Sequence, residues 1–151
     1  MMTIAHASFS IKRTFKHPPY KVFEAFAEQD KKHHWFVASD GPEWTTKRYG
    51  LDFTVGGQEH GEWVGPDGIA HANETTYLDI VDNERIVYAY TMAMDGVVHS
   101  ASLATIQFLA DDVGTQLTYC EQGAYFQGSD GIEGREKGWT WLLDHLEKAL
   151  A

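Results

Sequence analysis

Apolar and polar residues alternate near the start of the chain and then change to helical spacing. Residues 8–15 alternate along their whole length, which predicts a first β-strand. Proline is poor inside a strand but favourable at the first position of a helix, so Pro19 marks the start of a short amphipathic helix that reaches about Glu28. Asp30 is a residue type that caps helices, and a second short helix is expected to run from it to Phe36.

After the second helix the apolar spacing becomes close to two, and turn residues interrupt it. Residues 51–55 and 58–64 are predicted to form one strand, in which the Gly56-Gly57 pair is typical of a β-bulge. The turn residues 65–68 predict a hairpin. Four further strands are expected between turns, over residues 69–80, 85–92, 98–109 and 115–122.

The last segment returns to helical spacing. Asp130 and Glu133 resemble a capping box. Glycine weakens an early turn at Gly134 and Gly138, so the firm helix is expected to begin between Arg135 and Gly138. Its apolar stripe consists of Trp139, Leu142, Leu143, Leu146 and Leu150.

These elements predict a single α+β domain over residues 1–151. The expected order is a strand, two short helices, five or six antiparallel strands and a long helix. A sheet with its helices gathered on one face is an α+β arrangement. A long helix against the concave face of a curved sheet leaves a volume that side chains do not fill, and such mostly apolar volumes are where small molecules bind.

The net charge argues against some classes of binding partner, and the cysteine content bears on the cellular location. The chain has 12 basic and 22 acidic residues and a formal net charge of −10. A field of this sign repels phosphate groups, which argues against nucleic acid and against an anionic membrane surface. No signal peptide is visible, and no apolar stretch approaches the roughly 20 residues that span a bilayer. Cys120 is the single cysteine, so no internal disulfide is expected and a cytoplasmic location is favoured.

Four short segments, taken together and in order, resemble a known family. They are residues 18–26 (PPYKVFEAF), 34–36 (HWF), 52–57 (DFTVGG) and 138–139 (GW) followed by the leucine stripe. As a set they resemble the START-like (SRPBCC) superfamily, which has the helix-grip, or Bet v-like, fold. Within that superfamily the chain is similar to the branch named for the activator of the heat-shock-protein-90 ATPase.

The resemblance implies a curved antiparallel sheet of six or seven strands around a long C-terminal helix, with two short helices after the first strand. It also implies an internal cavity and, commonly, a hydrophobic ligand. It does not imply one activity, because relatives include lipid carriers, polyketide aromatases and cyclases, antibiotic-sequestering proteins and co-chaperone domains, and fold does not fix function.

The most suggestive polar residues lie on the hairpin closed by residues 65–68. In the expected register Glu62 faces His71 and His60 faces Asn73, and facing side chains share one face of a sheet. Such a set suits acid–base catalysis or a divalent metal. Contact with a polar ligand group and, most simply, a solvated outer face are the alternatives. A bulge at Gly56-Gly57 would turn His60 and Glu62 into the cavity.

Other reactive residue types give weaker evidence for catalysis. His99 lies beside Ser100, but no strand-to-helix nucleophile elbow presents a serine, and Cys120 on a strand is a small buried residue. No catalytic residue, metal site or cofactor is therefore predicted. Aromatic residues make up 13% of the chain, enough to line both a core and a cavity. The cavity-lining candidates are Trp35, Phe53, His60, Glu62, Trp63, His71, Tyr77, Tyr88, Tyr90, His99, Tyr119, Tyr125 and Trp139.

The leading functional hypothesis is a binder of a hydrophobic or aromatic small molecule rather than an enzyme. The first alternative is an enzyme of polyketide cyclase, dehydratase or hydrolase type that uses the sheet histidines and glutamate. The second is a co-chaperone-like protein-interaction module. A homodimer is a further expectation, because exposed strand edges are often covered by pairing.

Overall fold

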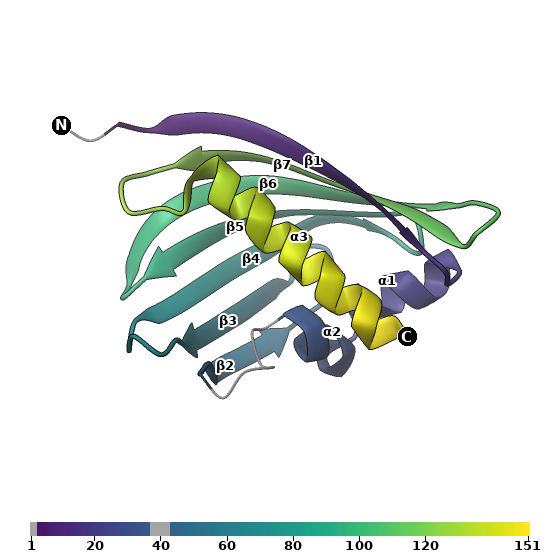
Figure 1. Cartoon of the computed structure of the whole chain (residues 1–151), viewed down its shortest axis with the longest axis horizontal. Helices are drawn as coiled ribbons and strands as arrows, with labels where there is room; N and C mark the ends of the chain where they lie inside the picture. The colour runs from purple at the N-terminus through teal and green to yellow at the C-terminus, as the bar shows by residue number, and fades with distance from the viewer. Residues whose placement is uncertain (1–2, 37–42) are drawn as a thin grey trace.

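The computed structural model describes residues 3–36 and 43–151, and this part of the chain contains seven strands and three helices (Figure 1). Their order is that predicted from the apolar spacing, with a strand, two short helices, six more strands and a long helix. The elements are β1 (Ala5–Phe15), α1 (Pro19–Ala27), α2 (Gln29–Phe36), β2 (Thr45–Leu51), β3 (Gln58–Val64), β4 (Ala70–Val81), β5 (Arg85–Met94), β6 (Val97–Ala110), β7 (Thr115–Tyr125) and α3 (Gly131–Leu150).

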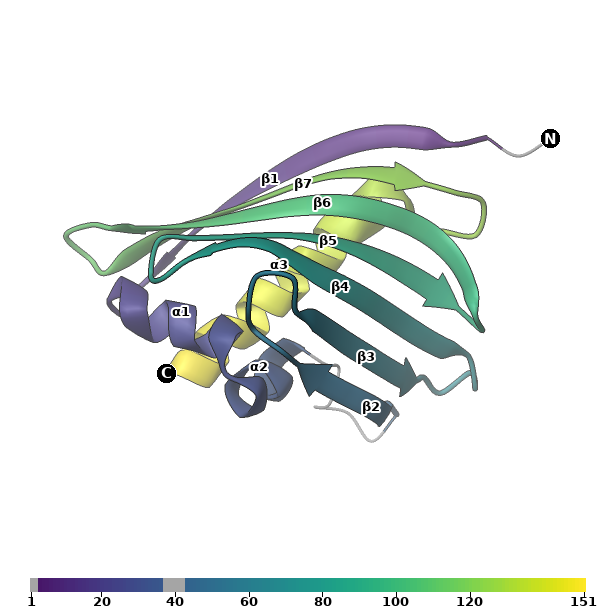
Figure 2. The same ribbon diagram turned by 180° about the vertical axis from the view of Figure 1, so that it is seen from behind.

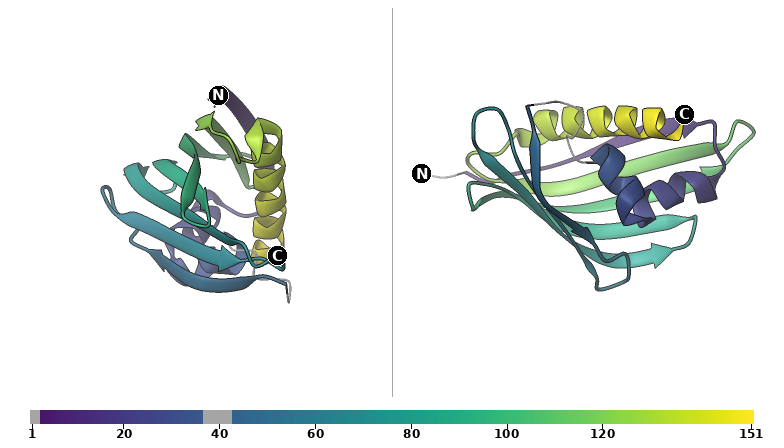
Figure 3. Two further views of the ribbon diagram at one scale, coloured as in Figure 1. Left: turned by 90° about the vertical axis from the view of Figure 1, so that its left-hand side faces the viewer. Right: turned by 90° about the horizontal axis from the view of Figure 1, so that it is seen from below.

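All seven strands form one antiparallel sheet in the order β1-β7-β6-β5-β4-β3-β2. The sheet is strongly curved, and α3 lies along its concave side (Figures 1 and 3). The two short helices lie beside the C-terminal end of α3, as the view from behind also shows (Figure 2). The predicted α+β architecture is therefore confirmed. No helix in the described residues is long and apolar enough to cross a membrane.

The hydrophobic core lies between the concave side of the sheet and the helices. The ring of Phe23 in α1 packs edge-on against Phe108 in β6, with 5.3 Å between ring centroids. The indole of Trp35 in α2 donates a hydrogen bond of 2.9 Å to the carbonyl of Ala25 in α1, and the indole ring packs 4.9 Å from Phe26. Aromatic packing thus fixes both short helices against the sheet.

The prediction of one strand through Gly56-Gly57 was wrong. Residues 52–57 form the turn between two separate strands, β2 and β3. The Gly57 amide donates to the Thr54 carbonyl at 2.8 Å, and Gly56 has a φ of 86°, which favours glycine. The glycine pair therefore reverses the chain and does not bulge a continuous strand.

The long helix begins at Gly131, four residues before the earliest predicted start. The expected capping box is not formed, because the Asp130 side chain makes no cap hydrogen bond. Both of its carboxylate oxygens accept instead from the Arg135 guanidinium, each at 2.9 Å. The early turn at Gly134 is therefore stabilised by this side-chain clamp, which helical propensity alone does not reveal.

Candidate functional site

A cleft of about 210 Å³ lies between α3 and the inner face of β3, β4 and β5. Its walls are mostly aromatic and apolar, with an amide, a phenol and one ion pair among them. We refer to it as the α3 cleft. It is lined by Phe36, Trp63, Asn73, Tyr90, Met92, Asp130, Arg135, Gly138, Trp139, Trp141 and Leu142.

The floor of the α3 cleft depends on a glycine. Gly61 pairs with Asn73 across β3 and β4. A Cβ atom at Gly61 would clash with the Trp63 ring and would lie 2.8 Å from the Asn73 Oδ1 atom. The absence of a side chain at Gly61 therefore gives the Trp63 ring and the Asn73 amide their places in the cleft.

Asn73 carries an acceptor without a donor. Its side chain is 3% exposed, and its Nδ2 group donates to Thr75 Oγ1 at 3.0 Å. Its Oδ1 atom is buried and has no hydrogen-bond partner among the described residues. A buried carbonyl oxygen without a donor is costly, and in native proteins it calls for a specific explanation.

Arg135 ties α3 to the sheet at one end of the cleft. It is 6% exposed, and its Nη1 group donates to the Tyr90 hydroxyl at 3.0 Å and to the Glu121 carboxylate at 3.2 Å. Its Nη2 group donates to Ser100 Oγ at 2.7 Å. Although burial alone would lower the pKa of Arg135, its hydrogen bonds to Asp130 hold that pKa above the ordinary value. Arg135 is therefore a fixed cation.

Glu121 is the carboxylate at the centre of this network, and it is fully buried. Its Oε1 atom accepts from Tyr90 at 2.6 Å and Tyr119 at 2.7 Å, while its Oε2 atom accepts from Ser102 at 2.9 Å and Tyr125 at 3.0 Å. With Arg135 this makes five donors to the two carboxylate oxygens.

The tyrosines of the network are held in their protonated form. Burial and the Glu121 charge raise the pKa of Tyr90, against a lowering effect of Arg135. The same two causes raise the pKa of Tyr125 to about 12. At neutral pH these phenols therefore act as donors.

A second buried ion pair connects α2 to β3. Lys32 is 2% exposed and Glu59 is 1% exposed, and the Lys32 Nζ atom lies 2.7 Å from Glu59 Oε1. The hydroxyls of Tyr77 and Tyr49 donate to the two Glu59 oxygens at 2.8 and 2.5 Å. This pair does not line the α3 cleft.

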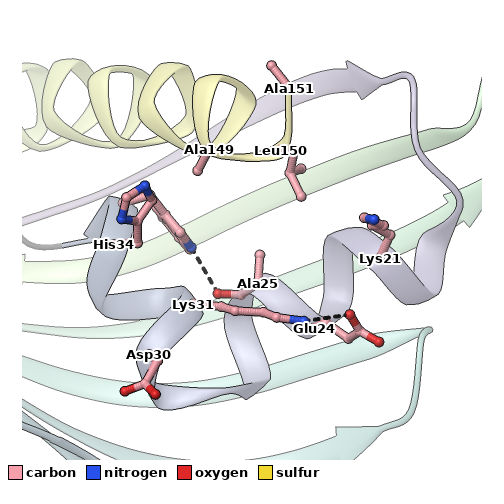
Figure 4. A pocket seen from close by; sticks show the side chains of 10 residues that line it. Lys21, Glu24, Ala25, Asp30, Lys31, His34, Ala149, Leu150 and Ala151 are labelled. Atoms are coloured by element: carbon pink, nitrogen blue, oxygen red, sulfur yellow. Dashed lines mark hydrogen bonds and ion pairs between the residues drawn. The ribbon is translucent and has the colours of Figure 1, made fainter.

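A larger hollow, of about 470 Å³, lies elsewhere, between α1, α2 and the end of α3 (Figure 4). Its rim carries charges of both signs, and Lys31 there pairs with Glu24 at 2.9 Å and with Glu28 at 3.2 Å. It contains no buried polar atom that lacks a partner among the described residues. We therefore take the smaller α3 cleft as the candidate site.

The predicted polar set on the β3–β4 hairpin is not assembled. Val64 pairs with Ala70, so His60 faces Glu74 and Glu62 faces Ala72. The connection is one residue longer than the register assumed, and a slip of one residue moves every side chain of a strand to the other face. His60 and Glu62 alternate with Gly61 and Trp63, which are on the inner face, and therefore lie on the outer face, where His60 pairs with Glu74. His60 and Glu62, listed among the cavity candidates, thus lie outside the α3 cleft, in the position of the solvated outer face that was the simplest alternative.

The other two predicted histidines lie on the inner side of the sheet. The His71 ring lies 5.3 Å from that of Trp44. His99 is the extra residue of a β-bulge, because Met92 pairs with Ser100 while Ala93 pairs with Val98. Its side chain is buried, its Nδ1 atom has no partner within the described residues, and burial lowers its pKa.

The aromatic candidates divide into three groups. Trp63, Tyr90 and Trp139 line the α3 cleft. Tyr119 and Tyr125 contact Glu121, and the Tyr119 ring stacks on Trp139 with centroids 4.0 Å apart. The remaining four pack in the core without lining the cleft, namely Trp35, Phe53, Tyr77 and Tyr88.

The buried charges were not among the predicted site residues, although the chain carries a signal for two of them. Arg135 precedes Trp139 by four residues and so lies on the apolar stripe of α3. Glu121 has the same strand parity as Leu117 and Tyr119, which are buried. A charged residue in an apolar register is the pattern that could have identified both. Among the described residues, no three His, Cys, Asp or Glu side chains form a group that could hold a metal ion.

A curved antiparallel sheet wrapped around a long final helix defines the helix-grip fold of START-like proteins. Residues 16–151 match the family described as activator of Hsp90 ATPase homolog 1-like protein, and the chain belongs to this family. No curated protein matches the chain.

Solved structures of bacterial proteins share the fold over nearly the whole chain. A Rhizobium leguminosarum protein is 38% identical, with a TM-score of 0.91 and coverage of 99% of this chain and 97% of the other. A Rhizobium loti protein is 37% identical, with a TM-score of 0.88 and coverage of 97% and 99%. A Chromobacterium violaceum protein is 23% identical, with a TM-score of 0.79 and coverage of 95% and 96%, and supports the fold alone.

Proposed function

We propose that the chain binds a small molecule with an apolar or aromatic body in the α3 cleft. The observation that carries the proposal is the buried Oδ1 atom of Asn73, which has no donor among residues 3–36 and 43–151 and belongs to a residue that lines a cleft walled by tryptophans. Ligand sites typically combine apolar walls with a few fixed polar groups. The cleft has this composition, and a ligand donor would satisfy the amide oxygen.

The position of two sheet residues supports a binding role over catalysis. His60 and Glu62 lie on the outer face of the sheet and cannot act on a molecule in the cleft. The single cysteine supports a cytoplasmic setting for the proposed binder. The family description refers to an activator of a chaperone ATPase, so a protein partner is the alternative.

The test is a titration with 1-naphthylmethanol, a neutral two-ring alcohol, followed by nuclear magnetic resonance of the indole N–H groups. The signals of Trp63, Trp139 and Trp141 are expected to shift in a saturable way. The signal of Trp35 is expected to stay fixed, because that indole is buried outside the cleft and donates to Ala25. No shift at the three cleft tryptophans with any of several apolar probes would contradict the proposal.

A pair of glycine variants provides the matched control. Gly61→Ala should push the Trp63 ring or the Asn73 amide into the cleft and weaken binding about tenfold. Gly50→Ala lies on the neighbouring strand, where an added Cβ meets nothing within 4 Å, and should leave binding unchanged. Equal affinities of both variants and the unmodified chain would place the bound probe outside the α3 cleft.

A further inference from the structure

We propose that the α3 cleft selects ligands whose polar group is a nitrogen that donates hydrogen bonds, preferably a cationic amine, over carboxylates and other anions. This inference rests on the proposed function and specifies its ligand class. Three observations carry it: a saturated arginine, an excess of carboxylate charge and the lone Asn73 acceptor.

Arg135 would ordinarily suggest an anionic ligand, because guanidinium groups bind carboxylates and phosphates. A guanidinium has five N–H donors. Here the Nε, Nη1 and Nη2 groups make five hydrogen bonds to the protein itself, with Asp130, Tyr90, Glu121 and Ser100 as acceptors. An incoming anion would therefore have to displace a protein acceptor, so Arg135 is not a free anion site.

The charge beside the cleft is negative. Arg135 supplies one positive charge, whereas Asp130 and Glu121 each supply one negative charge, so the three sum to −1. Asp130 is the member that a ligand can reach, since its side chain is 38% exposed and lines the cleft. The other buried pair, Lys32 with Glu59, is balanced. A cation in the cleft would therefore be attracted and an anion repelled.

The remaining polar group of the floor is an acceptor. One N–H of the Asn73 Nδ2 group donates to Thr75, and the buried Oδ1 atom has no donor among the described residues. An alcohol or an amine can donate to this atom, whereas a carboxylate can only accept and would leave it without a partner. The geometry thus adds a penalty for anions to the charge effect.

The walls also suit a cation. Trp63, Trp139 and Trp141 line the cleft together with Phe36 and Tyr90. The faces of aromatic rings attract ammonium groups, and tryptophan does so most strongly. The aromatic walls would therefore contact the apolar body of such a ligand and also attract its ammonium group.

The experiment compares three probes with one ring system: 1-naphthylmethylamine, 1-naphthylmethanol and 1-naphthoate, measured by isothermal titration calorimetry at neutral pH and low salt. The amine is expected to bind about tenfold more tightly than the alcohol, and the carboxylate to bind most weakly. Equal binding of all three, or tightest binding of 1-naphthoate, would overturn this inference while leaving the proposed function intact. Binding of none would overturn both.

Amino-acid substitutions test which residues cause the preference for the amine. Asp130→Asn removes the reachable carboxylate charge and should reduce the amine-to-alcohol ratio about threefold or more. Asn73→Leu should weaken the binding of the amine and of the alcohol, which both donate hydrogen bonds. It should leave the binding of 1-naphthoate unchanged. Glu74→Gln also removes one negative charge, but on the outer face, and should leave the ratio unchanged. An equal effect of Asp130→Asn and Glu74→Gln would assign the preference to the overall charge of −10 and overturn the local inference.

Discussion

The two buried ion pairs of this molecule have similar chemistry but different surroundings. Lys32–Glu59 and Arg135–Glu121 each join a helix to the sheet, and tyrosine hydroxyls donate to both carboxylates. The first pair is balanced and bordered by packed side chains. The second includes a partly exposed third member, Asp130, and borders an open cleft. Burial of charge alone therefore does not identify a site, whereas a charge imbalance beside unfilled volume does.

The largest expected loss of stability comes from breaking the balanced pair, Lys32–Glu59. Lys32→Met would leave Glu59 buried with only the two hydroxyls of Tyr77 and Tyr49, and should lower the free energy of unfolding by about 3–5 kcal/mol. Urea unfolding followed by circular dichroism measures this loss. The double variant Lys32→Met with Glu59→Gln should recover much of it. A loss below about 1 kcal/mol in the single variant would mean that the comparison is wrong.

Arg135→Met should cost less, about 2–3 kcal/mol, because Glu121 keeps four hydroxyl donors. The same urea experiment measures it. Arg13→Met is the matched control, since Arg13 pairs at 2.8 Å with a half-exposed Asp144, and such surface pairs contribute less than about 1 kcal/mol. A larger loss for Arg135→Met than for Lys32→Met would reverse the order proposed for the two pairs.

A third change tests the cleft floor in the absence of ligand. Asn73→Leu removes the buried Oδ1 atom, which has no donor among the described residues, but also the hydrogen bond of 3.0 Å to Thr75, so the free energy of unfolding should change by less than about 1 kcal/mol. Thermal unfolding measures the difference. We expect the variant to stay as stable as the unmodified chain and to lose probe binding, because Asn73 is proposed to serve ligand binding and not folding. A clear loss of stability would show that the amide is needed for folding instead.

The smallest expected effect concerns pH. Because burial lowers the pKa of His99 in the folded chain, the unfolded chain binds more protons as the pH falls below about 6.5. Stability should therefore be fully present above that value and decline below it. His99→Gln should flatten the decline, whereas His34→Gln, at an exposed position of α2, should not. Urea midpoints between pH 8 and pH 5 provide the measurement, and identical slopes in all three chains would contradict the prediction.

The order of elements was predictable because periodicity reports directly on which face of an element is buried. Pro19 and the apolar spacing after it were sufficient for α1, and Trp139 with its leucines was sufficient for most of α3. The β3–β4 register was not predictable, because a turn of four residues and a connection of five read alike along the chain. That single residue decided that His60 and Glu62 face Glu74 and Ala72 instead of Asn73 and His71.

The polar part of the site was harder to predict for a different reason. Lysine, glutamate and arginine are almost always exposed, so residue type alone did not mark Lys32, Glu59, Glu121 and Arg135 as parts of a site. Their partners are up to 45 residues away in the chain, as for Arg135 and Tyr90. Only the fold brings such residues together, although their positions in apolar registers were visible.

The position of α3 after all seven strands has a consequence for synthesis on the ribosome. The sheet, including Glu121, emerges before Arg135 does. Until α3 arrives, the Glu121 carboxylate and its tyrosines face water and are hydrated, which keeps the concave side of the nascent sheet from being wholly apolar. Docking of α3 then exchanges that water for the guanidinium. The α3 cleft therefore cannot be complete before the last element of the chain has been synthesised, and any molecule that occupies it binds a chain that already includes α3.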